Sequence, residues 1–303
     1  MKKTLILVLA LGFALTSSAQ KTITLSTEVS GADEIVVLWD NTTAPHSNGI
    51  TEDEGINDNL DMVKTTQTDL YIYRANPAQA TGQGVVIVPG GGYRKLSMKY
   101  DGFMVAKYLR EIGVSSIVVK YRMPNGQRDV PFEDILEAMR YMRREGVAWG
   151  VNPTKVGILG SSAGGYLAGH ISTMAPDEEK PAFSILIYPV ISGGQASHRG
   201  TFANMLGKWR TNTEHIYYSL ENRVTKTTPP ALLLLADDDL TVRTTNGTAY
   251  YKALKRYGIP ASMHVYSSGK HGWAGHDEWH YAEPCKAAIK DWLELMQNGI
   301  VRK

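Results

Sequence analysis

Short, nearly continuous apolar runs recur along the chain after its first twenty residues. They are rich in Val, Ile and Leu and contain little strict alternation of apolar and polar positions. Strands that are buried on both faces of a parallel sheet have this pattern. The runs predict strands at 85–88, 116–120, 156–159, 185–188 and 232–235.

Between these runs, apolar residues recur at helical spacing. Such faces are formed by Phe103, Ala106, Leu109 and Ile112, by Ile135, Met139 and Met142, and by Ile289, Trp292 and Met296. Strands that alternate with helices predict βαβ units. We therefore expect an α/β fold with a doubly wound, mostly parallel sheet and helices on both faces. The last strand is expected at 262–266 and the last helix at about 279–297.

Two polar stretches interrupt this alternation. Residues 40–69 contain Asn-Gly and Pro turn signals and are interpreted as an N-terminal excursion. Residues 192–230 contain paired glycines, paired prolines and several aromatic residues. An insert at this place in such a sheet is expected either to overhang the site as a lid or to form a surface elaboration.

The first twenty residues have the layout of a secretory signal peptide. Lys2 and Lys3 precede an apolar run at 5–15, and small residues follow at 16–19. The run is too short to span a bilayer as a helix, so an uncleaved anchor is the less favoured alternative. We expect a signal peptide at 1–20, a single catalytic domain at 21–303, and a secreted or periplasmic protein that has no membrane segment once mature.

The charge and cysteine content exclude several classes of function. Removing Lys2 and Lys3 lowers the formal charge from +2 to 0, and no basic run remains. Nucleic acid is therefore not an expected partner. Cys285 is the only cysteine, which excludes an internal disulfide and thiolate metal clusters.

The segment 155–166 contains Gly160-x-Ser162-x-Gly164 directly after a predicted strand and before a predicted helix. A nucleophilic serine on a strained strand-to-helix turn requires this arrangement, because side chains at the two glycine positions would meet neighbouring backbone. A phosphate-binding turn is the alternative, but the Lys of a P-loop is missing. Ser162 is the predicted nucleophile, and the adjacent Ser161 does not lie between the glycines.

Three glycines follow the strand at 85–88, in the run Pro89 to Tyr93. Backbone N–H groups there can approach a developing oxyanion closely. We expect the oxyanion donors to be the N–H groups of Gly91, Gly92 and Ala163; an ordinary flexible turn is the alternative for the glycines.

The acid and the base should follow the nucleophile in the chain. Asp237, Asp238 and Asp239 stand at the end of the strand at 232–235, and His271 follows the last strand within Gly269–Trp273. His46, His198 and His215 precede the acids, His170 falls in a helix and His264 in a strand. His276 and His280 are four residues apart, but no third ligand is placed beside them, so we expect no metal and no cofactor.

With these motifs, the chain resembles the carbohydrate-esterase branch of the α/β-hydrolases, which includes acetyl-xylan-esterase-like and feruloyl-esterase-like proteins. The residues that carry the likeness are Leu38-Trp39, Ala44-Pro45, Pro89–Tyr93, Lys120–Arg122, Trp149–Pro153, Gly160–Gly165, Thr228–Pro230, Asp239 and Gly269–Trp273. The resemblance implies an α/β-hydrolase fold and Asp239 as the acid, three residues before Val242, with Asp238 as the alternative. Arg243 departs from the Pro that is usual in the family.

The resemblance implies an exported serine esterase that removes acyl groups, acetyl above all, from a small acylated sugar or oligosaccharide. Tyr93, Trp209 and Trp273 are expected either to contact the substrate or to pack in the core. The alternatives are a general carboxylesterase or lipase, a serine peptidase, and a non-catalytic glycan-binding protein on an esterase scaffold.

Overall fold

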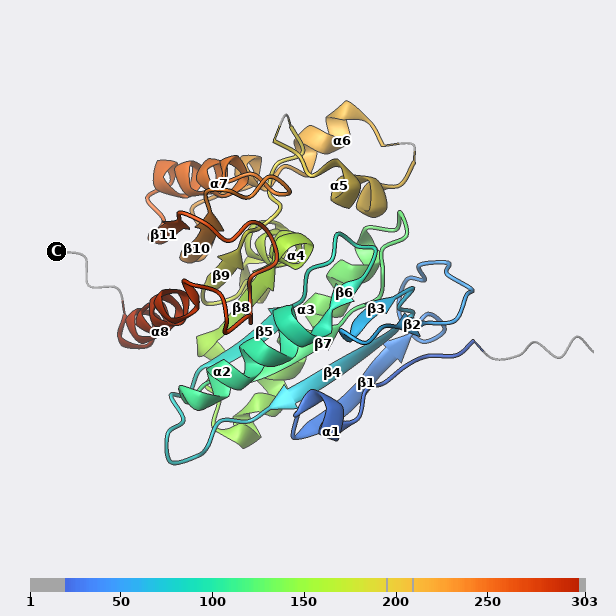
Figure 1. Ribbon diagram of the computed structural model, residues 1–303, viewed down its shortest axis with the longest axis horizontal. Coiled ribbons are helices and arrows are strands. Elements are labelled where there is room, and N and C mark those ends of the chain that lie inside the picture. The colour runs from blue at the N-terminus through green and yellow to red at the C-terminus, as the bar shows by residue number, and fades with distance from the viewer. Residues whose placement is uncertain (1–19, 195, 209, 300–303) are drawn as a thin grey trace, which may run out of the picture.

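A computed structural model describes residues 20–194, 196–208 and 210–299. The predicted signal peptide therefore lies almost wholly outside the described residues. An eight-stranded sheet in the order β1-β4-β7-β5-β8-β9-β10-β11 crosses the molecule, and Figure 1 shows it passing from the blue N-terminal strands to the red C-terminal ones. Its strands are β1 (Glu34–Asp40), β4 (Gln67–Tyr73), β5 (Gly84–Val88), β7 (Ser115–Lys120), β8 (Val156–Ser161), β9 (Ser184–Ile187), β10 (Ala231–Ala236) and β11 (Ala261–Tyr266).

The sheet is mostly parallel. The pairings of β1 with β4 and of β4 with β7 are antiparallel, whereas every pairing from β7 to β11 is parallel. All residues of β5, β7, β8, β9 and β10 are buried, as the apolar runs predicted. The predicted α/β fold is confirmed.

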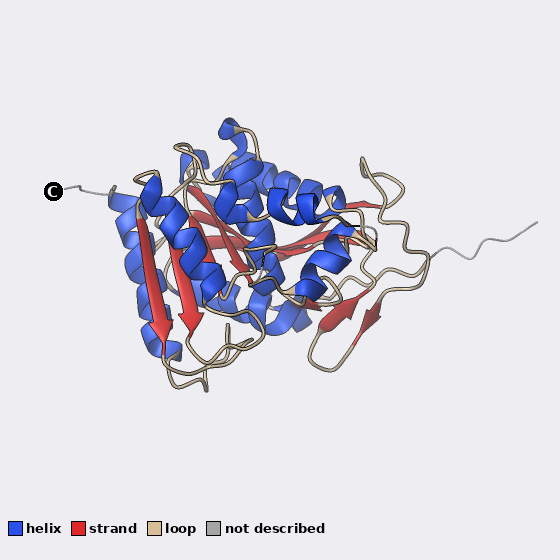
Figure 2. Ribbon diagram, turned by 90° about the horizontal axis from the view of Figure 1, so that it is seen from above, coloured by secondary structure: helices blue, strands red, loops and turns tan. Residues whose placement is uncertain are grey.

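Helices cover both faces of this sheet, as Figure 2 shows. They are α1 (Thr27–Ser30), α2 (Val105–Glu111), α3 (Asp129–Glu145), α4 (Ser162–Met174), α5 (Arg199–Leu206), α6 (Asn212–Tyr217), α7 (Thr245–Arg256) and α8 (Ala282–Asn298). The hydroxyl of Tyr108 on α2 donates to the carbonyl of Lys286 on α8 at 2.6 Å, which joins two helices far apart in sequence. Among the described residues, no helix is both long and apolar enough to cross a membrane.

The N-terminal excursion is shorter than predicted. Residues 67–69 already belong to β4, where they pair with β1 and β7. Before them, β2 (Gly55–Ile56) and β3 (Asp61–Val63) form a small sheet with β6 (Leu96–Ser97). Since β6 follows the predicted oxyanion loop, this small sheet supports one side of the site.

The last helix begins three residues later than predicted, at Ala282 rather than Trp279. Turns occupy the intervening residues: the N–H of Trp279 donates to His276 O and that of Ala282 to Trp279 O. The helical spacing of apolar residues continues into these turns because Trp279 packs partly against the core. Periodicity alone therefore placed the helix start too early.

Candidate active site

Ser162 is the first residue of α4 and follows β8 without an intervening loop. Its φ is +54°, in the left-handed region that a side chain rarely adopts. A Cβ on Gly160 would lie 2.3 Å from Gly164 O, and a Cβ on Gly164 would lie 2.0 Å from Val88 O. The two glycines therefore permit the sharp turn that presents the serine, for the reason expected from the sequence.

Ser162 lies at the start of a hydrogen-bonded chain that reaches two other loops. Its Oγ is 2.8 Å from Nε2 of His271, and Nδ1 of His271 is 2.6 Å from Oδ2 of Asp239. His271 lies in the loop between β11 and α8, and Asp239 lies in the turn after β10. The three residues thus have the mutual geometry of a nucleophile, a base and an orienting acid.

The structure separates the roles of the two neighbouring aspartates. Asp239 is 3% exposed, and its Oδ1 accepts hydrogen bonds from the N–H groups of Thr241 and Val242. These bonds hold the carboxylate toward His271. Asp238 instead accepts a hydrogen bond from the N–H of Lys270 at 2.7 Å. It contacts the backbone of the loop that carries the histidine, not the imidazole.

The predicted oxyanion loop lies against the nucleophile. A Cβ on Gly90 would be 3.0 Å from Ser162 Cβ, so the loop contacts the serine directly. Gly91 has φ +130° and Gly92 has φ +65°, and both line the same cavity as Ser162. Within the described part of the chain, neither glycine N–H donates to another protein group. The N–H of Ala163 belongs to the first turn of α4, where amides lack a partner inside the helix.

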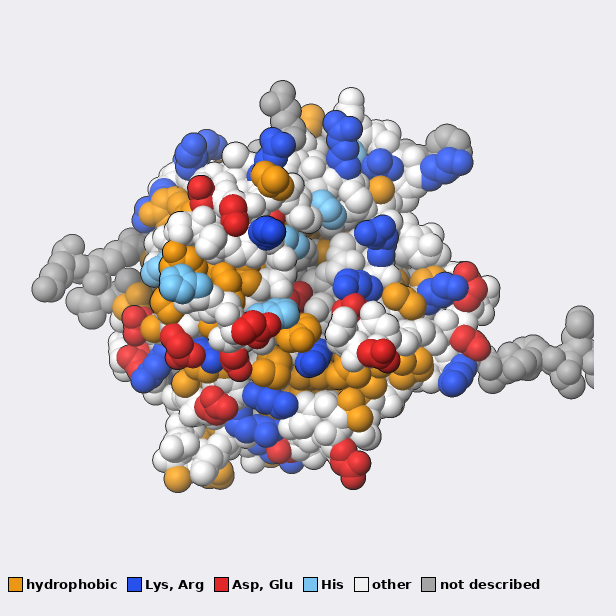
Figure 3. All heavy atoms as spheres, in the orientation of Figure 1, with side chains coloured by type: hydrophobic (Ala, Val, Ile, Leu, Met, Phe, Trp, Pro, Cys, Tyr) orange, Lys and Arg blue, Asp and Glu red, His pale blue; other side chains and the backbone are white. Residues whose placement is uncertain are grey.

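A cavity of about 750 Å³ opens at this point. Figure 3 shows the corresponding face, where His, Lys, Arg and acidic side chains lie around a central hollow. His198, Gly200 and Asn204 line the cavity and belong to the segment at 192–230. That segment therefore forms part of the wall and is more than a remote surface elaboration. Burial lowers the pKa of His198, and the nearby charges of His271 and Arg94 lower it further.

Comparison with known proteins identifies the fold family. The model of a family described as having the alpha/beta hydrolase fold matches residues 85–275, more than half of the chain. The chain belongs to the α/β-hydrolase family. The match includes the glycine loop, the Gly-x-Ser-x-Gly turn, the aspartate turn and the histidine loop.

Two curated relatives and one solved structure share more than the general fold with this α/β-hydrolase. An acetylxylan esterase of Xylanibacter ruminicola is 39% identical over 72% of this chain and 46% of its own length. Endo-1,4-beta-xylanase B of Butyrivibrio fibrisolvens is 29% identical over 62% of this chain and 32% of its own. The chain therefore spans less than half of either relative. An acetyl ester-xyloside bifunctional hydrolase of Caldicellulosiruptor lactoaceticus superposes with a TM-score of 0.70 and 26% identity, over 86% of this chain and 95% of that one.

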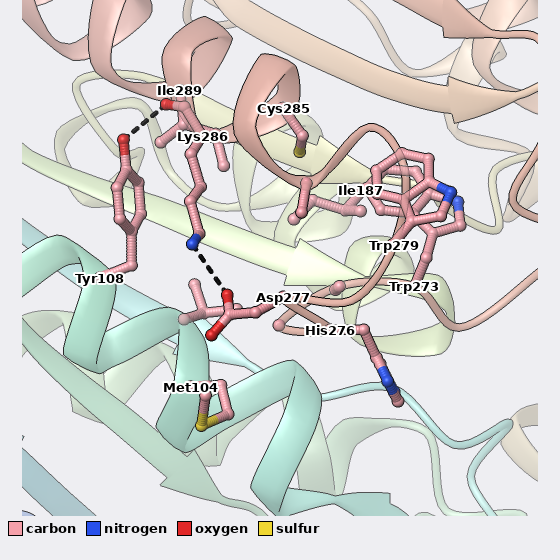
Figure 4. A pocket seen from close by; sticks show the side chains of 14 residues that line it. Met104, Tyr108, Ile187, Trp273, His276, Asp277, Trp279, Cys285, Lys286 and Ile289 are labelled. Atoms are coloured by element: carbon pink, nitrogen blue, oxygen red, sulfur yellow. Dashed lines mark hydrogen bonds and ion pairs between the residues drawn. The ribbon is translucent and has the colours of Figure 1, made fainter.

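The structure places two of the three aromatic residues that were expected either to contact the substrate or to pack in the core. Tyr93 is 3% exposed, and its hydroxyl donates to Ala163 O at 3.0 Å, so it supports the loop behind the nucleophile. Trp273 is 4% exposed and stacks on Trp279 with ring centroids 4.1 Å apart. Figure 4 shows both indoles beside a small pocket that also contacts α2 and α8. Neither Tyr93 nor Trp273 lines the cavity at Ser162. Tyr93 lines a second pocket next to that cavity, and Trp209 lies outside the described residues.

The histidines other than His271 have different surroundings. His170 stacks on Phe132 with ring centroids 3.6 Å apart, and burial lowers its pKa to about 3. His276 hydrogen-bonds Glu278 at 2.7 Å and stacks on Tyr100. No group of three or more His, Cys, Asp or Glu side chains within the described ranges is arranged to hold a metal ion.

Sequence reasoning missed Asp101, which lies on the π-helical turn Met98–Met104. Its Oδ2 accepts a hydrogen bond from the N–H of Gly90 at 3.0 Å, and its Oδ1 accepts one from the hydroxyl of Tyr188 at 3.0 Å. The hydroxyl oxygen of Tyr188 in turn accepts a hydrogen bond from the N–H of Ala274 at 3.1 Å, and the Tyr188 ring centroid lies 4.6 Å from that of His271. Burial raises the pKa of Asp101, while the hydrogen bonds from Gly90 and Tyr188 oppose the shift. The pair thus connects the oxyanion loop to the histidine loop.

We expect Asp101→Asn to lower kcat for 4-nitrophenyl acetate by roughly tenfold to a hundredfold while changing KM little, because small displacements of positioned groups are costly. An asparagine side chain has one acceptor oxygen where aspartate has two, so it loses the hydrogen bond either from Gly90 N–H or from the Tyr188 hydroxyl. One of the two loops is then no longer held in place. Steady-state kinetics beside Asp129→Asn, an exposed aspartate on α3, would measure the effect. A variant Asp101→Asn that kept the wild-type kcat and lost kcat/KM only through a higher KM would contradict this expectation.

Proposed function

We propose that this α/β-hydrolase is a serine esterase that removes acetyl groups from acetylated xylan oligosaccharides. The observation that carries the proposal is the hydrogen-bonded chain from Ser162 through His271 to Asp239, placed at an open cavity beside the glycine loop. The names of the acetylxylan esterase and the acetyl ester-xyloside hydrolase support the choice of substrate. The same residues need no metal or cofactor for ester hydrolysis.

In the first half-reaction, Nε2 of His271 accepts the Ser162 proton while Oγ attacks the acetyl carbonyl carbon. The carbonyl oxygen gains the electron pair and is stabilised by N–H groups of Gly91, Gly92 and Ala163. The imidazolium is stabilised by the Asp239 carboxylate, which stays ionised. The bond to the sugar oxygen then breaks, and that oxygen takes the proton from Nε2, leaving an acetyl-serine.

In the second half-reaction, a water molecule gives a proton to Nε2 of His271 and attacks the acetyl-serine carbonyl. The same N–H groups stabilise the second oxyanion. When the bond to Ser162 Oγ breaks, Nε2 returns the proton to that oxygen, and acetic acid leaves and ionises to acetate in solvent. The histidine must therefore contact both the serine and the incoming water, and it is partly exposed at the cavity.

The cavity favours a sugar over a lipid. Apart from Tyr100 and Tyr188, its lining side chains are polar or charged, and glycines complete it. Hydroxyl groups of a sugar can exchange hydrogen bonds with such a wall, whereas an acyl chain would leave buried polar groups unpaired. We also propose, from Lys2, Lys3 and the apolar run at 5–15, that the protein is exported to the periplasm or the medium, where such oligosaccharides occur.

Acetate release tests the function. The purified protein is incubated with acetylated xylo-oligosaccharides, with feruloylated arabino-xylo-oligosaccharides and with 4-nitrophenyl acetate, and free acids are quantified by chromatography. We expect acetate from the first and third substrates and much slower release of ferulate. Hydrolysis of 4-nitrophenyl acetate alone would reject the sugar substrate and retain the ester chemistry. A folded protein that releases no acid would contradict the esterase itself.

A further inference from the structure

A second pocket adjoins the catalytic cavity. It has a volume of about 430 Å³, and two residues, Arg94 and Asn204, line both spaces. The amide of Asn204 on α5 donates to Gly92 O at 2.8 Å, which ties the boundary between the pockets to the oxyanion loop. A ligand that places an ester at Ser162 can therefore continue past this boundary.

The second pocket is cationic. The residues that line it within the described part of the chain include Lys64, Arg94 and Lys208 but no Asp or Glu. The whole sequence has nearly balanced charge, with 32 Lys and Arg against 30 Asp and Glu. The imbalance in this pocket is therefore a local property. Lys64 is paired with Glu52 at 3.5 Å, so the attraction for anionic groups is expected mainly at the Arg94 end of the pocket.

Arg94 is the group best placed to bind an anion at the boundary. The residue is exposed, and its guanidinium makes no hydrogen bond or ion pair with the protein among the described residues. Lys95, the next residue, instead pairs with Asp61 at 2.7 Å. The backbone of Arg94 is held by its own N–H, which donates to Gly91 O at 3.2 Å. The guanidinium thus extends from a fixed backbone two residues after an expected oxyanion donor.

We propose that Arg94 binds the carboxylate of a uronic-acid branch, so that the preferred substrate is an acetylated acidic oligosaccharide. This inference rests on the proposed esterase function and adds the charge of the substrate. A guanidinium presents two parallel N–H donors that match the two oxygens of a carboxylate, whereas the hydroxyl groups of an uncharged sugar accept hydrogen bonds without the opposite charge or the paired geometry. The acetylated sugar occupies the cavity at Ser162, and the branch on the same or the neighbouring sugar enters the second pocket.

The test compares two acetylated xylo-oligosaccharides that differ only in a uronic-acid branch beside the acetylated xylose. We expect kcat/KM of the wild type to be about tenfold higher on the acidic substrate, the usual scale for one charge-assisted contact. Arg94→Gln should reduce this ratio to about one, and Arg94→Lys should leave an intermediate ratio because charge remains without the paired donors. Arg256→Gln, an exposed arginine of α7 that lines neither pocket, is the matched control and should retain the full ratio.

Ionic strength gives an independent readout. Raising NaCl from about 50 mM to about 500 mM should reduce the preference of the wild type and leave that of Arg94→Gln unchanged, because partly exposed charge pairs are screened. Equal kcat/KM of the wild type on the two substrates would overturn the inference and leave the esterase intact. A preference retained by a folded Arg94→Gln would also overturn it. Failure of the wild type to release acetate from any ester would instead reject the proposed function.

Discussion

We expect Ser162→Ala to lower kcat for 4-nitrophenyl acetate by about 10⁴-fold to 10⁶-fold, the range found when a triad nucleophile is removed. The methyl group cannot attack the carbonyl, although the glycine loop and the cavity remain. The oxygen that is removed forms the 2.8 Å contact with His271, so the acetyl-enzyme cannot form. Steady-state kinetics measure the fall in kcat. Rapid-mixing kinetics show whether the acetyl-enzyme forms, because its formation gives a burst of 4-nitrophenol that the variant should lack.

Ser161→Ala is the matched control. Ser161 is fully buried at the end of β8, where its Oγ lies near the hydroxyl of Tyr188 but makes no hydrogen bond of normal geometry, and that hydroxyl donates to Asp101. Its removal therefore leaves no donor unpaired, and kcat should stay within about threefold of the wild type. If instead Ser161→Ala abolished activity and Ser162→Ala retained it, the assignment of the nucleophile would be wrong.

The fold could be predicted because its central strands are buried on both faces. The strands β5, β7, β8, β9 and β10 are buried on both faces, so their sequences are mostly continuous apolar runs. A strand with one exposed face would instead alternate apolar and polar residues. The turn at Ser162 could be predicted for a related reason. Only glycine fits at positions 160 and 164, where a Cβ would meet backbone oxygen or another glycine. In both cases the requirement leaves a short, contiguous sequence pattern, although at Gly164 the atom that a Cβ would meet, Val88 O, belongs to the neighbouring strand β5.

The rest of the site depends on packing between distant segments. Trp273 follows the base by two residues, yet it stacks on Trp279 instead of facing the cavity. The sequence left contact with substrate and core packing as alternatives for Trp273. The tertiary contact with Trp279 shows that the side chain packs in the core. Asp101 carries no motif because its hydrogen-bond partners, Gly90 and Tyr188, are brought to it by two different loops.

The sequence motif alone does not decide which aspartate orients His271. Asp238 and Asp239 are consecutive residues of the same type, and the resemblance favoured Asp239 while leaving Asp238 as the alternative. The turn after β10 decides between them, because the N–H groups of Thr241 and Val242 fix the Asp239 carboxylate. A backbone turn of this kind directs consecutive side chains in different directions. Asp238 therefore points to Lys270 N, although it is as close to His271 in sequence.

We expect Asp239→Asn to lower kcat about 10⁴-fold, because the amide can donate to Nδ1 of His271 and so favours the tautomer that cannot accept the serine proton at Nε2. Asp238→Asn should lower kcat by less than about tenfold, because an amide oxygen still accepts the hydrogen bond from Lys270 N. The measurement is kcat of both variants on 4-nitrophenyl acetate between pH 6 and pH 9. The two substitutions are isosteric and affect adjacent residues, so each serves as the control for the other.

The pH dependence distinguishes a catalytic acid from a structural one. If Asp239 orients the imidazole, Asp239→Asn should regain part of its rate at high pH, where hydroxide competes with the base in removing the serine proton. Asp238→Asn should keep the wild-type profile, because the 2.6 Å contact between His271 and Asp239 is unchanged. A profile shifted by Asp238→Asn and not by Asp239→Asn would assign the orienting role to Asp238 and would require the turn after β10 to rearrange in solution.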